Sequence, residues 1–340
     1  MNPYPECLLT REWQYAAFVT GPLLDFWRQR QEGMFIGVDD VPIRFVRFTS
    51  PLHQHLVVVL PGRTDSYVKY AEVAYDLFQC GYDVLMMDHR GQGRSGRLLK
   101  DRYRGHVKRF SDYVDDVATL WQQQVAPGHY TKGHYTEGHY TKRFALAHSM
   151  GGAILAQFLA RQPQAFDAVA LCAPMCGILL PMPRWLAWRI LDWAERHPAI
   201  RDYYAIGTSP WRPLPFMANV LTHSHARYRR HVRFYADDPD LRIGGPTYHW
   251  VREALLVETQ LLPQAAEITT PLLLLQAEEE RVVDNRSQDA FCRALAAAGH
   301  PCADGRPYVV RGARHDILSE KDAMRADAFG RILQHFNDYH

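Results

Sequence analysis

The segment Phe144-Ala145-Leu146-Ala147-His148-Ser149-Met150-Gly151-Gly152-Ala153 decides the fold of this chain. An apolar run ends at Ser149, and two glycines then lead into a helical pattern that extends to Arg161. This order is typical of a nucleophile elbow, in which a serine occupies a sharp turn between a strand and a helix. Bulky side chains close to such a strained residue would clash with the adjoining strand and helix, so small neighbours are expected. The usual form is Gly-x-Ser-x-Gly, and Ala147 replaces its first glycine here; alone, the motif also fits an ordinary buried serine.

Apolar runs that alternate with helical patterns extend on both sides of this segment. Residues 56–60 are apolar and rich in β-branched side chains, which is typical of a buried parallel strand. Similar runs predict further strands at 82–87, 144–148, 167–173, 271–276 and 308–310. Helices are expected at 66–79, at 110–124 with Ser111 as the N-cap, and at 153–162, 287–298 and 321–336. Because this alternation implies right-handed crossovers, the sequence predicts the α/β class, with a mostly parallel central sheet and helices on both faces.

Segments of different character precede and interrupt the predicted core. Residues 34–38 and 42–48 indicate a hairpin, and the aromatic-rich stretch before them includes a short helix at 23–31. Residues 177–262 hold five of the eight tryptophans, and they break the alternation of strands and helices. We expect this segment to be a helical cap over the carboxyl ends of the strands. The expected division is therefore a lead-in (1–33), a core (34–176 and 263–340) and a cap insertion (177–262).

An activated serine needs a base, and the base needs a carboxylate that orients it. The chain offers these groups in the order serine, acid, histidine. Glu280 and Asp284 follow the strand at 271–276, and His315 follows the strand at 308–310. The carboxyl ends of parallel strands meet at one edge of a sheet, so we expect these loops to converge. The candidate nucleophile is Ser149, the general base and acid is His315, and the orienting acid is Glu280, with Asp284 as the alternate.

The negative oxygen that forms during acyl transfer needs preorganised N–H donors. In a nucleophile elbow one donor is the residue after the serine, which is Met150, and the other lies in a loop after an early strand. That loop is Pro61-Gly62-Arg63, so the backbone of Arg63 is the second candidate, and Gly62 permits a close approach. His89 and His148 lie beside turns without a partner carboxylate nearby in the sequence, and we expect structural roles for both.

At these residues the chain resembles the monoacylglycerol lipase and lysophospholipase branch of the α/β-hydrolases. The resemblance spans residues 34–338 and is carried by His148-Ser149-Met150-Gly151-Gly152, by Asp88 to Ser95, and by Leu272 to Asp284. It implies the α/β-hydrolase fold, a serine esterase activity, and Glu280 at the acid position, where many relatives have aspartate. Pro61 stands where the family has histidine, but neither this departure nor Ala147 removes a catalytic atom.

Composition excludes several classes of protein. A net charge of +2 over 340 residues gives no reason to expect nucleic-acid binding. The six cysteines lack the spacing of zinc ligands, so we expect buried free thiols, no metal and no cofactor. Neither a signal-peptide core nor an apolar run of ~18 residues is present. We therefore expect a cytoplasmic protein without a signal peptide or transmembrane span, which binds peripherally to the inner face of the cytoplasmic membrane.

A five-residue repeat interrupts the core before the elbow. The sequence Gly-His-Tyr-Thr followed by Lys or Glu occurs three times within 128–142. His129, His134 and His139 suggest a metal site, but no carboxylate or cysteine completes a ligand set. The alternative, a duplicated surface loop, is the interpretation that we favour.

Arginines dominate the charge of the cap, which contains eleven of them and no lysine. Four lie within seven residues: Arg227, Arg229, Arg230 and Arg233. One interpretation of this cluster is a solvated helix face. The other is a contact with a lipid phosphate, for which a guanidinium offers paired donors.

The leading hypothesis is therefore a lysophospholipase, which cleaves the acyl ester of a lysophospholipid through an acyl-enzyme and releases a fatty acid and a glycerophospho-compound. The aromatic cap would supply apolar surface for the acyl chain. Its arginines and aromatic side chains also predict attachment to an anionic membrane surface. The alternatives are a monoacylglycerol lipase, a general carboxylesterase, a side activity of acyl transfer, and a non-catalytic lipid-binding module.

Overall fold

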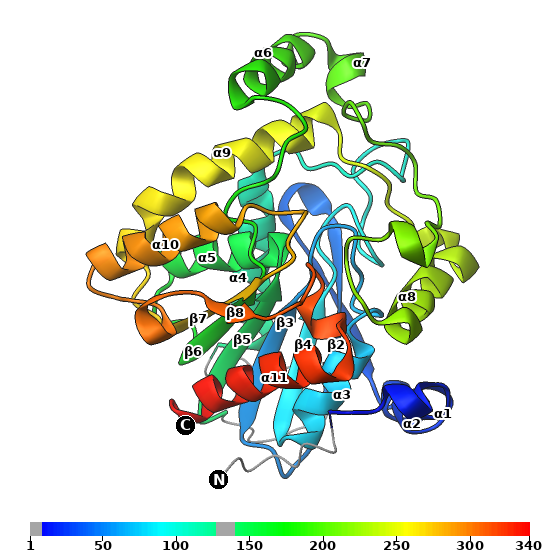
Figure 1. Cartoon of the computed structure of the whole chain (residues 1–340), viewed down its shortest axis with the longest axis vertical. Helices are drawn as coiled ribbons and strands as arrows, with labels where there is room; N and C mark the ends of the chain where they lie inside the picture. The colour runs from blue at the N-terminus through cyan, green and yellow to red at the C-terminus, as the bar shows by residue number, and fades with distance from the viewer. Residues whose placement is uncertain (1–8, 127–139) are drawn as a thin grey trace.

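A twisted eight-stranded sheet forms the centre of the molecule in a computed structural model that describes residues 9–126 and 140–340 (Figure 1). The order of its strands is β1-β2-β4-β3-β5-β6-β7-β8. The strands are β1 (Gln31–Ile36), β2 (Pro42–Phe48), β3 (His55–Leu60), β4 (Tyr82–Met87), β5 (Lys142–His148), β6 (Ala168–Cys172), β7 (Leu272–Ala277) and β8 (Tyr308–Val310). β1 and β2 form the predicted antiparallel hairpin, and the strands from β4 to β8 are parallel. The predicted fold class is confirmed.

Helices cover both faces of this sheet, because successive side chains of a strand point to opposite sides. On β3, Leu56 and Val58 belong to one buried cluster, whereas Val57 belongs to the other. The first cluster is covered by α4 (Phe110–Gln124), α5 (Met150–Arg161), α9 (Tyr248–Gln264) and α10 (Asn285–Ala297). The second is covered by α1 (Tyr15–Thr20), α2 (Pro22–Arg28), α3 (Ala71–Gln79) and α11 (Asp322–Asn337). Burial on both faces explains why the inner strands β3, β4, β6 and β7 are mostly apolar.

Two helices begin with contacts that the sequence did not predict. The predicted helix at 66–79 begins at Ala71, because the Ser66 hydroxyl and the Tyr67 N–H donate to the carboxylate of Asp88 instead. The helix at 110–124 has the predicted bounds, but Ser111 lies inside it. The N–H of Phe110 donates to a carboxylate oxygen of Glu253 at 2.7 Å, so a side chain of α9 satisfies this helix end.

The expected cap segment contains α6 (Arg184–Glu195), α7 (Pro198–Arg201) and α8 (His225–Asp237), and it ends within α9. Figure 1 shows α6 and α7 at the top of the molecule, above the edge of the sheet where the loops converge, with α8 to one side. The division into lead-in, core and cap remains a prediction. The five-residue repeat and its three histidines lie largely outside the described residues.

None of the helices in the described ranges is both long enough and apolar enough to cross a membrane. The five cysteines that the structure describes are free, as expected: Cys80, Cys172, Cys176, Cys292 and Cys302.

Candidate active site

Ser149 occupies the sharp turn between β5 and α5. Its backbone has φ 52° and ψ −118°, a conformation that costs an L-residue free energy unless its surroundings hold it. The neighbouring strand β6 provides that support, because the Ser149 N–H donates to the carbonyl of Cys172 at 3.0 Å. The Ser149 carbonyl accepts from the N–H of Met175 at 2.9 Å. The serine is therefore held rigidly, with its side chain above the carboxyl end of β5.

The glycines of the elbow are required by contact distances. A Cβ atom on Gly151 would lie 2.5 Å from the backbone oxygens of both Leu60 and Pro61, which no relaxation of a side chain can relieve. A Cβ atom on Gly152 would lie 2.7 Å from Pro174. The elbow thus packs directly against the end of β3, and this contact brings the loop after β3 close to the serine.

Three of the predicted catalytic residues form one hydrogen-bonded chain. His315, on the loop after β8, places Nε2 at 2.9 Å from Ser149 Oγ. Its Nδ1 lies 2.8 Å from an oxygen of Glu280, on the loop after β7. The three side chains come from loops that are far apart in the sequence, and each loop follows a parallel strand as expected.

Glu280 is held in its ionised form. One of its oxygens accepts from the backbone N–H groups of Val282 at 2.7 Å and Val283 at 3.2 Å, while the other faces His315. Burial raises the pKa of this carboxyl, but the hydrogen bond and charge of His315 and these N–H donors outweigh it, so the pKa lies below its usual value. The alternate acid, Asp284, is the N-cap of α10 and accepts from the N–H of Arg286 at 3.0 Å. The geometry therefore favours Glu280 over Asp284.

The two predicted N–H donors flank the serine. Met150 is the first residue of α5, and Arg63 follows Gly62 in the loop after β3. A Cβ atom on Gly62 would lie 3.3 Å from the Cβ of Ser149, so this loop touches the nucleophile. Neither N–H has a hydrogen-bond acceptor in the part of the chain that the structure describes, and both are therefore free to bind an oxyanion.

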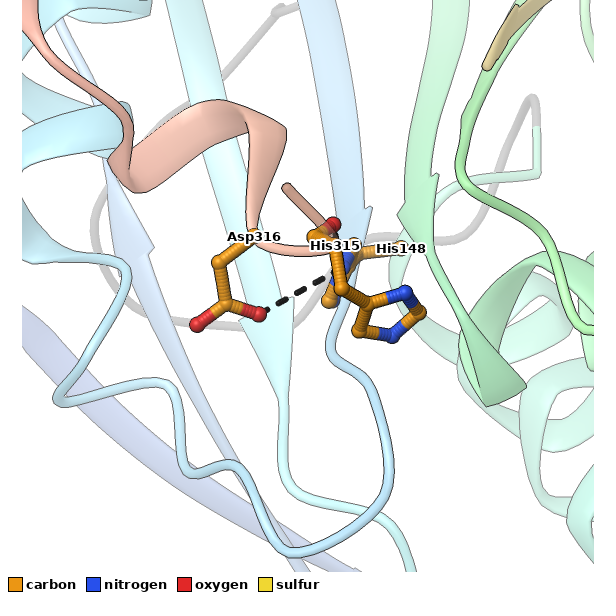
Figure 2. A group of neighbouring side chains, drawn as sticks. All are labelled: His148, His315 and Asp316. Atoms are coloured by element: carbon orange, nitrogen blue, oxygen red, sulfur yellow. Dashed lines mark hydrogen bonds and ion pairs between the residues drawn. The ribbon is translucent and has the colours of Figure 1, made fainter. Parts of the chain in front are cut away.

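His148, the residue before Ser149, has partners that its sequence neighbourhood did not indicate. Sequence proximity indicated no partner carboxylate, but the fold places two beside it, Asp65 and Asp316, each with an oxygen 3.7 Å from a ring nitrogen. Figure 2 shows His148 and His315 side by side with Asp316 close to His148. The rings of the two histidines lie 4.8 Å apart between centroids. His148 is thus part of a buried charged cluster directly beside His315.

Lys69 completes this cluster. Its ammonium lies 2.9 Å from Asp65 and 2.7 Å from Asp316, and all three side chains are buried. Burial disfavours the ammonium, but the two carboxylates raise the pKa of Lys69 above its usual range. Asp65 follows the oxyanion loop, and Asp316 follows His315. One lysine therefore joins the loop of the N–H donor to the loop of the base.

The hydrogen bonds of His148 assign its protonation state. Its Nε2 lies 3.0 Å from the carbonyl oxygen of His315, which can only accept, so Nε2 carries a proton. Its Nδ1 lies 3.0 Å from the hydroxyl of Tyr70, which donates its single proton to Asp65 at 2.9 Å. Nδ1 must then donate as well. Burial lowers the pKa of His148, but the hydrogen bond to Asp65 and the charges of Asp316 and Asp65 reverse this and raise it.

His89 differs from His148. Burial lowers the pKa of His89 to about 4, and its Nε2 lies 3.0 Å from the carbonyl of Pro61, which fits its expected structural role.

Sequence reasoning missed Asp65, Lys69, Tyr70 and Asp316. Two signals were present: Lys69 lies one helical turn after Asp65, and Asp316 follows His315 directly. Lys69 and Asp316, however, are separated by 247 residues, so only the fold shows that they meet.

A metal ion fits poorly among these groups. Among the described residues, His148, His315 and Asp316 form a group whose ligand atoms all lie within 4.8 Å of one another. His315 already faces Ser149 and Glu280, and Asp316 binds Lys69. An ion at this place would have to displace the contacts that organise the serine and its base.

The cap arginines differ in position, and the expectation for Arg227 is wrong. Its guanidinium is fully buried and binds the carboxylates of Glu72 on α3 and Asp322 on α11, so it cannot reach a headgroup. Arg229 and Arg233 are exposed on α8, and Arg230 lies over the ring of Phe234. For Arg229, Arg230 and Arg233, contact with a headgroup remains a prediction.

An apolar pocket of about 190 Å³ lies under α6. Its walls include Leu179 and Leu180 after β6, Leu191 on α6, and Trp250 and Val251 on α9. The segment that leads to Leu179 begins at Met175, which hydrogen-bonds to the backbone of Ser149. The pocket wall is thus joined to the turn of Ser149 through the chain, although Ser149, Glu280 and His315 are not among its described lining residues.

Comparison with known proteins gives a consistent result. The family model described as serine aminopeptidase, S33, matches residues 52–322. Lysophospholipase L2 of Escherichia coli K12 is 61% identical over 328 residues, which cover 96% of this chain and 94% of that protein. The monoacylglycerol lipase of Mycolicibacterium smegmatis is 28% identical over 86% of this chain and 92% of its own length. The solved structure of a thermostable carboxyl esterase from Bacillus coagulans superposes with a TM-score of 0.69 at 17% identity, covering 91% of this chain and 98% of that one, and this likeness shows the α/β-hydrolase fold.

Proposed function

Because this chain belongs to the serine aminopeptidase S33 family, in the lysophospholipase and monoacylglycerol lipase branch of the α/β-hydrolases, we propose that it is a lysophospholipase. The observation that carries this proposal is the 61% identity to a protein named Lysophospholipase L2 over nearly the whole of both chains. The substrate is a single-chain phospholipid, and the products are a fatty acid and a glycerophospho-compound.

In the proposed mechanism Ser149 attacks the acyl carbonyl while His315 takes its proton through Nε2. The N–H groups of Arg63 and Met150 bind the oxygen that becomes negative. His315 then protonates the departing glycerol oxygen, and an acyl-enzyme remains on Ser149. Water, activated by His315, releases the fatty acid, and Glu280 stabilises the histidine each time that it becomes positive.

The name of the family suggests a peptide substrate with a free amine. The charges of the site support an ester substrate instead. A peptide amine would need an available carboxylate. The carboxylates that contact the two histidines beside Ser149 are Asp65, Glu280 and Asp316, and each is already bound to Lys69 or His315.

The apolar pocket under α6 supports the proposal that the substrate carries a long acyl chain. Its described lining is almost wholly aliphatic or aromatic, and such surface binds a hydrocarbon chain by removing both from water. This pocket suits a monoacylglycerol equally well, so it does not by itself select the lysophospholipid.

We also propose that α6 contacts an anionic membrane surface. Trp185 and Trp193 are 64% and 50% exposed on this helix, and the exposed Arg189 lies between them. Tryptophan favours the interface of a bilayer, and arginine binds anionic headgroups. α6 lies at the end of the molecule away from the C-terminus (Figure 1). Flotation with vesicles tests this: replacement of both tryptophans by serine is expected to weaken binding, and binding that ignores anionic lipid and salt would contradict it.

A substrate panel tests the activity. Purified protein is given lysophosphatidylethanolamine, monoolein and a diacyl phospholipid, with Ser149→Ala as the control. Release of fatty acid fastest from the lysophospholipid and its loss in the variant are expected. Faster hydrolysis of monoolein would favour a monoacylglycerol lipase, and a fluorophosphonate that fails to label Ser149 would leave a lipid-binding module.

A further inference from the structure

Buried arginines in this protein are paired with carboxylates. Arg90 binds Asp116, Arg227 binds Glu72, and Arg325 binds Asp76, and in each case the guanidinium is almost completely buried. Such pairing is expected, because a buried charge without a counter-ion is costly.

Arg63 is an exception. Its side chain is partly buried between the core and the loop before α9, yet no carboxylate lies within ion-pairing distance among the described residues. The nearby Asp65 is bound by Lys69. Burial lowers the pKa of Arg63 to about 10, although Tyr113 and Asp65 oppose this. The fold therefore keeps a cation here without neutralising it.

The guanidinium of Arg63 is fixed on one side and free on the other. Its Nη1 donates to the carbonyl of Gly244 at 3.1 Å, and the group lies over the ring of Trp250 with 5.4 Å to the centroid. Within the described part of the chain, Nε and Nη2 have no acceptor, and both retain solvent-accessible surface. These two nitrogens form the edge of a guanidinium that binds two oxygens of one phosphate side by side.

The position of Arg63 relates this free edge to the reaction. Its own backbone is the proposed oxyanion donor, and the preceding Gly62 touches Ser149. Trp250, on which the guanidinium lies, also lines the apolar pocket. In a lysophospholipid only the glycerol backbone separates the ester from the phosphate. A side chain of this length beside the nucleophile can therefore reach the phosphate while the ester is at Ser149.

We propose that the side chain of Arg63 binds the phosphate of the substrate through Nε and Nη2. This inference rests on the proposed function, since it assumes a phosphate-bearing substrate. It makes Arg63 the residue that distinguishes a lysophospholipid from a monoacylglycerol, and it replaces Arg227 in the role that the sequence suggested.

The test compares Arg63→Gln and Arg63→Lys with the unchanged protein and with Arg28→Gln, an arginine of α2 whose side chain is 67% exposed. Short-chain lysophosphatidylglycerol, lysophosphatidylethanolamine and monoacylglycerol are used below their aggregation limits, so that membrane binding does not contribute. The variants retain the backbone N–H. Thermal unfolding and the rate of fluorophosphonate labelling establish that each variant is folded with a competent serine.

We expect Arg63→Gln to lower kcat/KM for both lysophospholipids relative to monoacylglycerol by about ten- to a hundredfold, mostly through KM, which is the range for one charge-assisted contact. Arg63→Lys should recover part of this, because it keeps the charge and loses the fork. Arg28→Gln should leave the ratio unchanged.

Two results would overturn the inference, and they differ. An equal loss on all three substrates would mean that Arg63 only tethers the loop to Gly244, and the proposed function would stand. If the unchanged protein hydrolyses monoacylglycerol but neither lysophospholipid, the proposed substrate is wrong and the phosphate contact falls with it.

Discussion

The ammonium of Lys69 lies 2.7 Å from the carboxylate of Asp316, the residue that follows His315, the proposed base. The same ammonium binds Asp65, which follows the oxyanion loop. The loops that carry Arg63 and His315, which are distant in sequence, thus share one buried cation.

Replacement of Lys69 by Met should destabilise the fold strongly. It would leave Asp65 and Asp316 buried without their cation, and breaking a buried pair costs about 3–5 kcal/mol. Urea unfolding measures this. The matched control is Lys142→Met, whose partner Asp167 is at 3.3 Å on the surface with side chains 30% and 32% exposed, and its effect should stay below about 1 kcal/mol. Similar losses for both variants would contradict the assignment.

The stability that His148 contributes should depend on pH. Its folded-state pKa is raised above the usual 6.5, so the charged form favours the folded state, and this contribution is present below pH 6.5 and lost as pH rises through the folded pKa. The difference in free energy of unfolding between the unchanged protein and His148→Gln should therefore shrink from pH 6 to pH 9. A difference that is constant or grows across this range would show that His148 is neutral.

Replacement of each candidate acid by its amide, in separate variants, should distinguish their roles. Glu280→Gln removes the charge that faces His315, and its amide can hold the histidine ring in the wrong tautomer. We therefore expect kcat to fall by about 10⁴. Asp284→Asn keeps an oxygen for the cap of α10, and its kcat should change by no more than a few-fold. Steady-state rates on a lysophospholipid measure both. The reverse order of effects would transfer the acid role to Asp284.

Gly151→Ala tests the packing of the elbow. The added Cβ would meet two backbone oxygens at 2.5 Å, so the protein should lose several kcal/mol of stability or fail to accumulate folded. Gly330→Ala is the control, because Gly330 lies in α11 and a Cβ there has no neighbour within 4 Å. That variant should be neutral or more stable by about 1 kcal/mol, since alanine favours helices. Equal thermal unfolding of both variants would mean that the elbow is not tight.

The sequence predicted the features that depend on local pattern. The bounds of β4 and α4 agree because apolar periodicity is read within one element. Side chains that meet across the fold could not be found in this way. The local pattern placed Ser66 in a helix, but its hydroxyl donates to Asp88 in the folded protein. The same reasoning allowed Arg227 to be a surface charge, but α8 directs its guanidinium to Glu72. Serine, acid and histidine were found because their order along parallel strands carries long-range information.

The ion pairs of Arg227 also limit how a lipid can enter. They bind α8 to α3 and α11, and any displacement of α8 would separate charges that are buried. α6 is attached differently: the surface pairs Arg184–Glu258 and Arg252–Asp192 and the walls of an apolar pocket hold it against α9. Buried pairs thus fix α8 to the core, whereas surface pairs and apolar contacts hold α6, the helix of the exposed Trp185 and Trp193. Of the two helices, α6 is therefore the one whose displacement would separate less buried charge.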